Sequence, residues 1–357
     1  MSLDTLIEER NRQALAGVHS ALLVDVCSVV YYLAFSRMDS YKRGRDSARL
    51  GRRIAAETAF FVRAAMKSIG LKMCVLCFDS KYSLRKSLYA PYKSKRREKP
   101  LLDAERFVID CAKDAAAVLL CNGHLLGFQT CNAYGYEADD CIAVNVNYLS
   151  PRVRRIVILS SDQDLFQLLG GNVLMAKPIG GALIGQEGVV KETGVTPDKI
   201  AEFKALAGCK SDDIPGVTDI GEKTAVEYLT GKPTTARRKA LIEAAEADGS
   251  LGLWRLLTKL PFPAWTISTE KGTTVYSQPF VCFDSEVTPL KCEGWLEQLA
   301  RDAGVNEDEF VSLLEGGEIV PEPETIQIPY RRETEPVLCV WGCDEYWNPC
   351  LVPVGTN

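Results

Sequence analysis

Histidine is almost absent from this chain of 357 residues, which has only His19 and His124, in unrelated contexts. Two such isolated imidazoles argue against a histidine-based catalytic triad and against a histidine-rich zinc site. The chain also lacks a positive net charge, because 42 basic residues face 47 acidic ones and leave a formal charge of −5. Any binding of nucleic acid must therefore come from local basic segments rather than from the field of the whole molecule.

Hydrophobic runs long enough to cross a membrane are also missing. The one suspect, residues 21–35, is shorter than the roughly 20 residues that a span needs. It contains Asp25 and follows acids rather than a basic segment. The 13 cysteines are scattered, mostly within apolar runs, which is typical of a reducing compartment rather than of a disulfide framework. We therefore expect a soluble cytoplasmic protein without membrane attachment.

The hydrophobic pattern predicts an α/β fold with a central, mostly parallel sheet flanked by helices. The length suggests two to three domains, or one large domain with an appendage. The expected strands are residues 21–26, 73–78, 124–130, 155–160 and 173–177, with a further strand within 275–283. The expected helices are residues 1–17, 29–35, 46–69, 102–120 and 197–206.

Acidic residues stand where several of these strands end. Asp25 lies at the end of the first strand, Asp79 follows the second, and Asp162 and Asp164 follow the fourth. Ligands of open α/β sheets bind at this carboxyl edge, and crowded carboxylates repel one another unless a cation such as Mg²⁺ or Mn²⁺ neutralises them. An acid in a strand buried on both faces is costly unless it is paired or bound to a metal.

A second set of acids opens an apolar helical pattern after residue 136. The set consists of Glu137, Asp139 and Asp140. Acids at a helix N-terminus are also favoured by the helix dipole alone, so this position by itself leaves both interpretations open. The metal interpretation gains weight from each additional strand that ends in an acid.

Basic residues and tyrosines alternate in the segment after Asp79. The basic members are Lys81, Arg85, Lys86, Lys93, Lys95, Arg96, Arg97 and Lys99, and the tyrosines are Tyr82, Tyr89 and Tyr92. Such a mixture suits a segment that holds phosphates and stacks on bases. The alternative is a solvated charged loop.

Residues 208–225 predict two helices joined by a turn that contains Gly216 and Gly221. Glycines at such a turn let backbone N–H groups come close to a phosphate, and the second helix offers its positive end. A plain packing motif has the same pattern. The acid Asp212 stands within plausible reach of the predicted metal site.

Five of these segments, in order, resemble motifs of the 5′ nucleases. This family includes bacteriophage flap endonucleases and 5′→3′ exonucleases, phage RNase H and the nuclease domain of bacterial DNA polymerase I. The matching segments, which span roughly residues 20–230, are Leu23-Val24-Asp25; Phe78-Asp79 with Arg85 and Tyr92-Lys93-Ser94-Lys95-Arg96; Glu137-Ala138-Asp139-Asp140; Ser161 to Leu168; and Ser211 to Val217 through Glu222-Lys223-Thr224-Ala225.

The resemblance implies two Mg²⁺ ions, with Mn²⁺ as a substitute. Asp25, Asp79, Glu137, Asp139 and Asp140 would hold or surround the first, and Asp162, Asp164 and Asp212, with Asp213, the second. It also implies a helical arch over residues 80–106, where Lys93, Arg96 and Arg85 act in catalysis and Tyr92, Lys95 and Arg97 contact DNA. The helix–hairpin–helix, with Gly216, Gly221, Lys223 and Thr224, would hold duplex DNA and a K⁺ ion.

One position departs from the family pattern. Cys209 stands where an Asp is usual, and Asp213 replaces the usual Asn. A thiol is a poor ligand for Mg²⁺, so the second metal site is expected to be rearranged, with Asp213 as a compensating acid.

The resemblance therefore implies a structure-dependent 5′ nuclease that acts in DNA replication or repair. Its expected substrates are DNA 5′ ends, flaps and nicks, and RNA–DNA hybrids. Replication proteins are the expected partners. We expect a monomer in the cytoplasm, or in the host cytoplasm for a phage protein. The predicted domains are a nuclease core (1–195), a DNA-binding subdomain (196–270) and an extension (271–357). The alternatives are a PIN-type ribonuclease and a catalytically impaired junction-binding protein, which a metal-dependent cleavage assay would separate.

Overall fold

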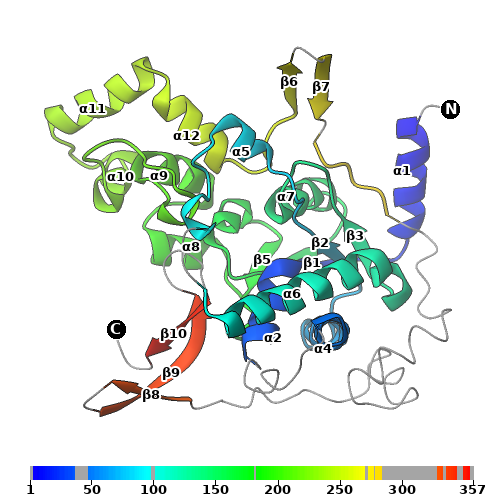
Figure 1. Ribbon diagram of the computed structural model, residues 1–357. Coiled ribbons are helices and arrows are strands. Elements are labelled where there is room, and N and C mark those ends of the chain that lie inside the picture. The colour runs from blue at the N-terminus through cyan, green and yellow to red at the C-terminus, as the bar shows by residue number, and fades with distance from the viewer. Residues whose placement is uncertain are drawn as a thin grey trace.

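Five parallel strands form the centre of the protein, in the order β3-β2-β1-β4-β5. Their bounds are β1 Ser20–Asp25, β2 Met73–Cys77, β3 Gln129–Cys131, β4 Arg155–Leu159 and β5 Val173–Ala176. The chain builds one half of the sheet outward from β1 and then returns to build the other half from β4. The direction in which strands are added switches between β1 and β4, and the carboxyl ends of strands at such a switch point are the usual ligand position of these sheets. The predicted α/β class is confirmed (Figure 1).

The structure is a computed structural model. It describes residues 3–36, 47–97, 101–180, 182–269, 272–276, 278–283, 328–332, 335–343 and 349–353. Lys99 and most of the predicted C-terminal extension therefore lie outside the described residues. None of the helices in the described ranges is long and apolar enough to cross a membrane.

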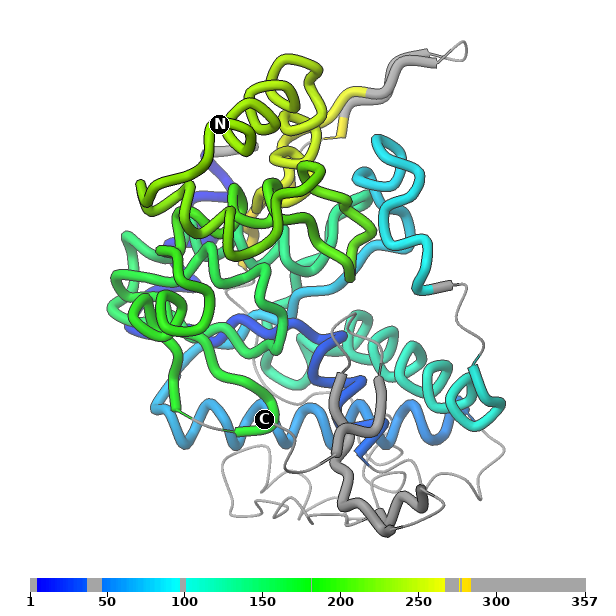
Figure 2. The backbone as a smooth tube through the Cα atoms, turned by 90° about the vertical axis from the view of Figure 1, so that its left-hand side faces the viewer, coloured from blue at the N-terminus to red at the C-terminus, as the bar shows by residue number. Residues whose placement is uncertain are grey.

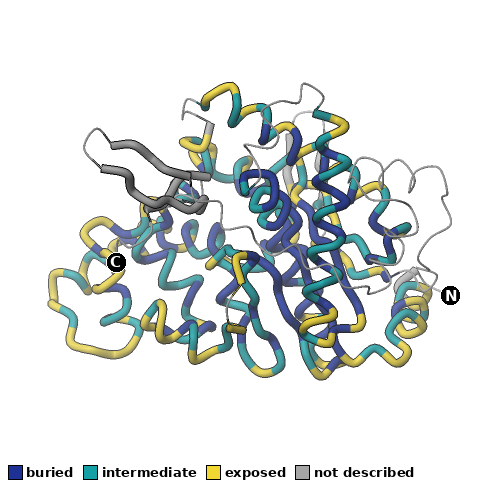
Figure 3. The backbone as a smooth tube through the Cα atoms, turned by 90° about the horizontal axis from the view of Figure 1, so that it is seen from below, coloured by how far each residue is buried: buried dark blue, intermediate teal, exposed yellow. Residues whose placement is uncertain are grey.

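Alternating strand residues face two separate hydrophobic layers. Leu22 and Val24 of β1 pack toward three helices, while Ala21 and Leu23 face the opposite layer, which includes α7. The first layer consists of α2 Val26–Ser36, α4 Ser47–Ile69 and α6 Asp103–Asn122, and the second contains α7 Ala138–Leu149 and α8 Gln186–Thr193. Helices α4 and α6 lie side by side (Figure 2). Figure 3 shows that buried residues are concentrated in the sheet and along the inner faces of these helices.

A helical region lies beside the sheet and has its own hydrophobic cluster, to which Leu206, Ala225 and Trp254 belong (Figure 1). Its elements are η4 Pro197–Lys199, α9 Ile200–Ala207, η5 Lys210–Asp212, α10 Glu222–Leu229, α11 Ala236–Ala247 and α12 Ser250–Thr258. Residues 208–221, which join α9 to α10, therefore form a compact loop that contains one short 3₁₀ turn.

Short elements complete the described chain. They are α1 Leu3–Ala14, α5 Leu84–Leu88, η1 Lys95–Arg97, η2 Gly123–Leu126, η3 Gln163–Leu168, the hairpin of β6 Trp265–Thr269 and β7 Gly272–Tyr276, and an antiparallel sheet of β8 Ile328–Arg332, β9 Glu335–Cys343 and β10 Pro349–Pro353.

Two predicted strands are shorter than expected. Residues 123–126 form a 3₁₀ turn that closes α6, and Gly127 then takes a left-handed backbone (φ +73°), so the third strand begins only at Gln129. Strand β7 ends at Tyr276, and the following segment is held by side chains instead of by a sheet. Asn11 Nδ2 donates to Val281 O (2.8 Å), and Phe283 N donates to Asn11 Oδ1 (2.7 Å).

Candidate active site

Asp25 is fixed at the end of β1 by polar groups from two neighbouring elements. Its Oδ1 accepts from Ser28 N (3.1 Å), and its Oδ2 accepts from Ser160 Oγ (2.8 Å). Ser160 follows β4, so both strands at the switch point contribute to one acidic group. The neighbouring strand β2 leads to Asp79, whose Oδ1 accepts from Ala138 N (2.8 Å) at the start of α7. Predicted acids from β1, β2 and α7 thus meet at the carboxyl edge of the sheet.

Three further acids come close enough to share a cation. Asp139, Asp162 and Asp164 each offer a carboxylate oxygen, and these oxygens lie within 4.8 Å of one another. Asp162 is the N-cap of η3 and accepts from Asp164 N (2.8 Å), which explains why both acids of this short turn face the same space. A set of three carboxylate oxygens is a suitable site for a hard divalent cation.

Asp25, Asp139 and Asp162 each have a raised pKa in the protein without metal. Burial, followed by the charge of Asp79, raises the pKa of Asp25 to about 7. Burial and the charges of Asp162 and Asp25 raise the pKa of Asp139 well above its ordinary value. Burial also raises the pKa of Asp162, against the opposing effect of Lys204. The acid group is therefore electrostatically strained until a cation is present.

Asp25→Asn should stabilise the metal-free protein at high pH. Because the pKa of Asp25 is raised from 3.8 to about 7 by folding, the stability that this group provides is full below about pH 4 and is lost as the pH rises through 7. In chelator, we expect the variant to unfold at a higher temperature than wild type at pH 8, with a stability that is higher by about 4 kcal/mol, and to match it near pH 4. Thermal unfolding across this range measures the difference.

The control for this measurement is Asp110→Asn, which alters an exposed acid on α6. It should leave the pH dependence of unfolding unchanged. Parallel curves for wild type and Asp25→Asn would contradict the raised pKa.

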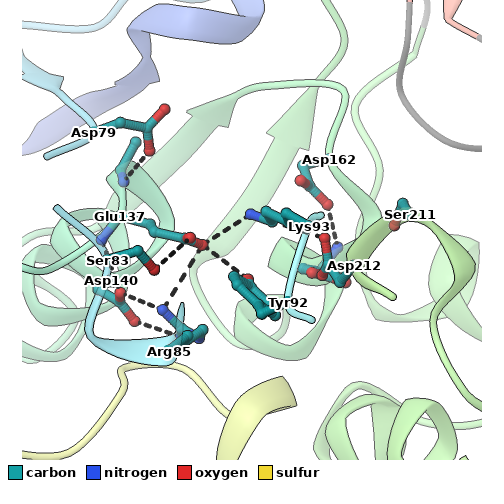
Figure 4. A network of polar contacts seen from close by, with 12 residues as sticks. Asp79, Ser83, Arg85, Tyr92, Lys93, Glu137, Asp140, Asp162, Ser211 and Asp212 are labelled. Carbon is teal, nitrogen blue, oxygen red and sulfur yellow. Dashed lines mark hydrogen bonds and ion pairs between the residues drawn. The ribbon is translucent and has the colours of Figure 1, made fainter. Parts of the chain in front are cut away.

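Glu137 lies at the N-terminus of α7 and is surrounded by donors from the basic segment (Figure 4). Its Oε2 accepts from Lys93 Nζ (2.9 Å) and from Tyr92 OH (3.0 Å). Burial pushes the pKa of Glu137 up, but the charges of Lys93 and Arg85 outweigh it and hold the pKa at about 2. Glu137 is therefore ionised and paired with Lys93, while its neighbour Asp139 faces the other acids.

Arg85, which was expected to act in catalysis, and Asp140, which was expected to hold or surround the first metal, form a buried pair with each other. Arg85 Nη1 donates to Asp140 Oδ2 (2.6 Å), and Nη2 donates to Oδ1 (2.8 Å), and both side chains are buried. The two Asp140 oxygens also accept from Glu137 N (3.0 Å) and Phe262 N (2.7 Å). Because these four donors occupy the carboxylate, Asp140 supports the site from behind, and Arg85 has no free face for a phosphate.

Tyr92 is likewise placed differently from the predicted stacking on DNA. Only 3% of its surface is exposed, and its ring packs in the hydrophobic cluster of the helical region. Its hydroxyl donates to Glu137. Tyr92 therefore anchors the basic segment and supports Lys93, whose ammonium lies 5.0 Å from the centre of the Tyr92 ring.

The remaining acids bind the basic segment to the loop between α9 and α10. Asp212 Oδ1 accepts from Arg96 Nη2 (3.1 Å), and Lys93 Nζ lies 3.8 Å from the same oxygen. Asp213 has a left-handed backbone (φ +57°) and accepts from Lys95 N (3.0 Å), with Lys95 Nζ at 3.2 Å. Asp212 thus lies beside the basic side chains of Lys93 and Arg96, whereas Asp213 binds Lys95. The side chain of Arg97 lies outside the description.

Cys209 occupies a hydrophobic place in the same loop. It belongs to the cluster of the helical region, and its Sγ lies 3.1 Å from Ser211 Oγ. Backbone hydrogen bonds in both directions join Cys209 to Ile214. Burial raises the pKa of the thiol, with a further contribution from Asp212. The protonated thiol that results supplies no charge to the acid group.

The two predicted glycines of the loop differ in their structural requirement. Gly216 has φ +71°, and a Cβ atom there would lie 2.3 Å from Gly208 N, so only glycine fits. Gly221 has an ordinary backbone and open space around it, and it forms the N-cap of α10. Lys223 is exposed beside it, but Thr224 is buried, so a direct contact of the Thr224 side chain with DNA is not supported.

Lys204 is a residue of this site that the sequence analysis missed. It comes from α9 and forms an ion pair with Asp164. The sequence shows only a lysine on a helix, and the pair depends on how α9 packs against η3. Ser28 and Ser160 were missed for the same reason, since each acts through the fold by orienting Asp25.

Comparison with known proteins gives a consistent family. The family model described as 5′-3′ exonuclease, N-terminal resolvase-like domain matches residues 20–196. The 5′-3′ exonuclease of Aquifex aeolicus is 35% identical over 156 residues, which are 43% of this chain and 51% of that protein. The 5′-3′ exonuclease of Bacillus subtilis is 36% identical over 168 residues, 46% and 53% of the two chains. Thermostable DNA polymerase I of Thermus thermophilus is 34% identical over 212 residues, 55% of this chain and 24% of that one.

A solved structure resembles most of the described chain. The bacteriophage T5 5′-exonuclease with bound zinc has a TM-score of 0.57 at 18% identity, and the match covers 83% of this chain and 99% of that one. At this identity the likeness concerns the fold. In sequence, the chain spans about half the length of the curated exonucleases it matches, and a smaller share of the polymerases.

Proposed function

We propose that this chain is a structure-dependent 5′ nuclease, since its residues 20–196 match the family model described as 5′-3′ exonuclease, N-terminal resolvase-like domain. The proposed reaction is hydrolysis of a phosphodiester near a 5′ end, flap or nick of DNA during replication or repair. The observation that carries the proposal is the group of acids at the β1–β4 switch point, with Lys93 and Arg96 held beside it.

The acid group fits divalent cations, for which we propose Mg²⁺, with Mn²⁺ as a substitute. Asp139, Asp162 and Asp164 offer carboxylate oxygens that lie close to one another. Asp25 and Asp79 are near enough for their charges to raise the pKa of Asp139. When bound, such cations neutralise phosphate charge and lower the pKa of coordinated water. The raised pKa values of Asp25, Asp139 and Asp162 agree with this fit, because burial and neighbouring carboxylates disfavour their ionised forms and a bound cation would favour them.

The protein's own groups then position and stabilise the phosphate. Lys93 and Arg96 hold cationic groups beside Glu137 and Asp212, where a phosphate could accept hydrogen bonds from them as negative charge develops. Tyr92 and the Arg85–Asp140 pair fix the backbone on which these groups stand. Glu137, ionised and bound to Lys93, keeps that lysine protonated.

For the duplex part of the substrate we propose the loop between α9 and α10. Exposed Gly221 and Lys223 give a backbone that a phosphate can approach closely at the N-terminus of α10, and Gly216 lets the loop pack tightly against Gly208. A K⁺ ion held by carbonyls of this loop is part of the proposal, which treats the loop as a helix–hairpin–helix. The similarity to DNA polymerase I supports a role in replication. We further propose RNA–DNA hybrids as substrates and a monomer that works in the cytoplasm beside replication proteins.

One gel separates the proposed function from its alternatives. Labelled 5′-flap, nicked duplex, RNA–DNA hybrid and single-stranded RNA substrates are incubated with Mg²⁺, with Mn²⁺ and in chelator. We expect cleavage of the flap near its junction with either metal, and none in chelator. Cleavage in chelator would contradict the metal mechanism. Tight binding of the junction without cleavage would identify an impaired junction-binding protein, and cleavage of single-stranded RNA alone would favour a PIN-type ribonuclease.

A further inference from the structure

Three tyrosine rings gather at the start of the basic segment, and we call Tyr82, Tyr134 and Tyr276 the tyrosine face. The ring centres of Tyr82 and Tyr134 are 5.3 Å apart with an interplanar angle of 8°, and Tyr276 lies 6.1 Å from both. Tyr134 is 66% exposed, although large apolar rings are normally covered. These rings come from three separate parts of the chain, so their near-parallel arrangement is a product of the fold.

A hollow of about 600 Å³ adjoins this face. Tyr134 and Tyr276 line it together with Phe280, which is 68% exposed. Polar side chains that can form hydrogen bonds, such as Asn132 and Gln278, complete the wall, and none of the described residues that line the hollow is charged. A neutral lining with aromatic rings and amide groups suits a nucleobase rather than a phosphate.

The tyrosine face is rigidly connected to the acid group. Asn132 Nδ2 donates to the carbonyl of Asp79 (3.3 Å), and Leu84 N donates to Gly135 O (2.9 Å). Tyr134 therefore lies between Asn132, which is bound to Asp79 after β2, and Gly135, which is bound to the start of α5. Strand β3, which leads into it, stands two strands from β1, or about 10 Å at the usual strand spacing.

The tyrosine face and the loop between α9 and α10 lie on opposite sides of the acids. Helix α9, which leads into the loop, contacts the acid group from the β4 side, where Lys204 pairs with Asp164. The tyrosine face follows β3, at the other edge of the sheet. In Figure 1, α9 and α10 are on the left of the sheet and β3 is on the right, with α5 between them.

We propose that the tyrosine face binds bases of the unpaired 5′ strand after it has passed the acid group. This inference rests on the proposed function, because it takes a duplex held at the α9–α10 loop and a scissile phosphate at the acids as given. A strand that continues in the same direction then reaches the tyrosines. Stacking on aromatic rings accepts any base, which a nuclease guided by DNA structure requires.

The charges around the face agree with a nucleic acid as its ligand. Lys81, directly before Tyr82, is exposed, and Lys86 follows on α5. Cations at the rim can hold the backbone of a single strand while the neutral hollow takes its bases.

The test compares two substrates that differ only in the unpaired strand. One is a duplex with a 5′ flap of ten thymidines, and the other is the same duplex with a nick and no flap. We expect Tyr134→Ala to weaken binding of the flap substrate about tenfold, within the range found when one stacking ring is removed. Binding to the nicked duplex should not change. Tyr134→Phe keeps the ring and should behave as wild type on both substrates.

Leu6→Ala serves as a second control, because Leu6 is an exposed apolar residue on α1. Equal losses on flap and nick, or no loss on either, would overturn the proposal. If wild type neither binds nor cleaves either substrate, the proposed function itself fails. If wild type cleaves the flap and Tyr134→Ala binds and cleaves it equally well, only the inference about the tyrosine face fails. Thermal unfolding confirms that the variants are folded.

Discussion

Asp162→Asn is expected to reduce the rate of DNA cleavage by about 10³-fold or more while DNA affinity stays within about threefold of wild type. Three decades of rate correspond to about 4 kcal/mol of lost transition-state stabilisation. The loss is expected because Asp162 is one of the three acids whose carboxylate oxygens lie within 4.8 Å of one another, so that its charge is part of the proposed cation site. The effect falls on rate rather than on affinity, because cations at the scissile phosphate act mainly on charge that develops in the transition state.

Asparagine is chosen because it retains the structural function of this side chain. The Asp162 carboxylate caps η3 by accepting from Asp164 N, and an amide oxygen can still accept this bond. The variant therefore removes one negative charge with little disturbance of the turn. Single-turnover cleavage and equilibrium binding of the 5′-flap substrate are measured at saturating Mg²⁺, with Asp110→Asn on the surface of α6 as the matched control.

Two other results would change the assignment. If rate and affinity fall by the same factor, Asp162 contributes to substrate binding and not to the chemical step. If Asp162→Asn retains full activity, the acid group is not the catalytic centre. A further titration of the variant with Mg²⁺ is informative, since a missing ligand should raise the concentration needed for half-maximal activity.

Acids at strand ends could be predicted because both features are local in the sequence. A short apolar run that ends in Asp25 or is followed by Asp162 predicts a strand with an acid at its carboxyl end. Parallel strands then bring these carboxyl ends to the same edge of the sheet. The third strand was misplaced because an apolar run after a helix has the same composition whether it forms a strand or a tight turn. The left-handed Gly127 decides between them, and its backbone angle is set by packing.

Long-range pairs were the part of the site that the sequence could not provide. Arg85 stands in a basic run and Asp140 beside two acids, so each has a local explanation that hides their buried contact. Tyr92 has the spacing of a stacking residue, yet the helical region more than a hundred residues later covers it. Lys204 is visible only once α9 lies against η3. Such contacts depend on where distant elements pack, which hydrophobic periodicity does not specify.

Arg85→Met is expected to destabilise the protein by about 3–5 kcal/mol, which is the usual cost of breaking a buried ion pair from one side. Methionine fills much of the volume but leaves the Asp140 charge fully buried without its main partner. The substitution also removes the donors to Leu257 O (2.9 Å) and Lys259 O (3.2 Å), so that α5 loses its connection to the end of α12. Chemical unfolding of the metal-free protein measures the change.

A double-mutant cycle separates the pair from its surroundings. Asp140→Leu alone should also destabilise strongly, because Glu137 N and Phe262 N lose their acceptor. The double variant should lose less stability than the two single variants lose together, since no uncompensated charge remains. As a control, Lys113→Met removes one partner of an exposed pair with Asp110 and should cost less than about 1 kcal/mol.

The same variants decide between the two roles that have been assigned to Arg85. A supporting role predicts that Arg85→Met loses stability in proportion to its loss of cleavage, and that activity per folded molecule recovers at low temperature. Direct contact with a phosphate predicts a fold that is as stable as wild type and a cleavage rate that is lower by orders of magnitude at every temperature. The second result would contradict the buried pair and restore the catalytic role that the sequence pattern favours. The geometry supports the first, because the guanidinium is already bound to Asp140 and to two backbone carbonyls.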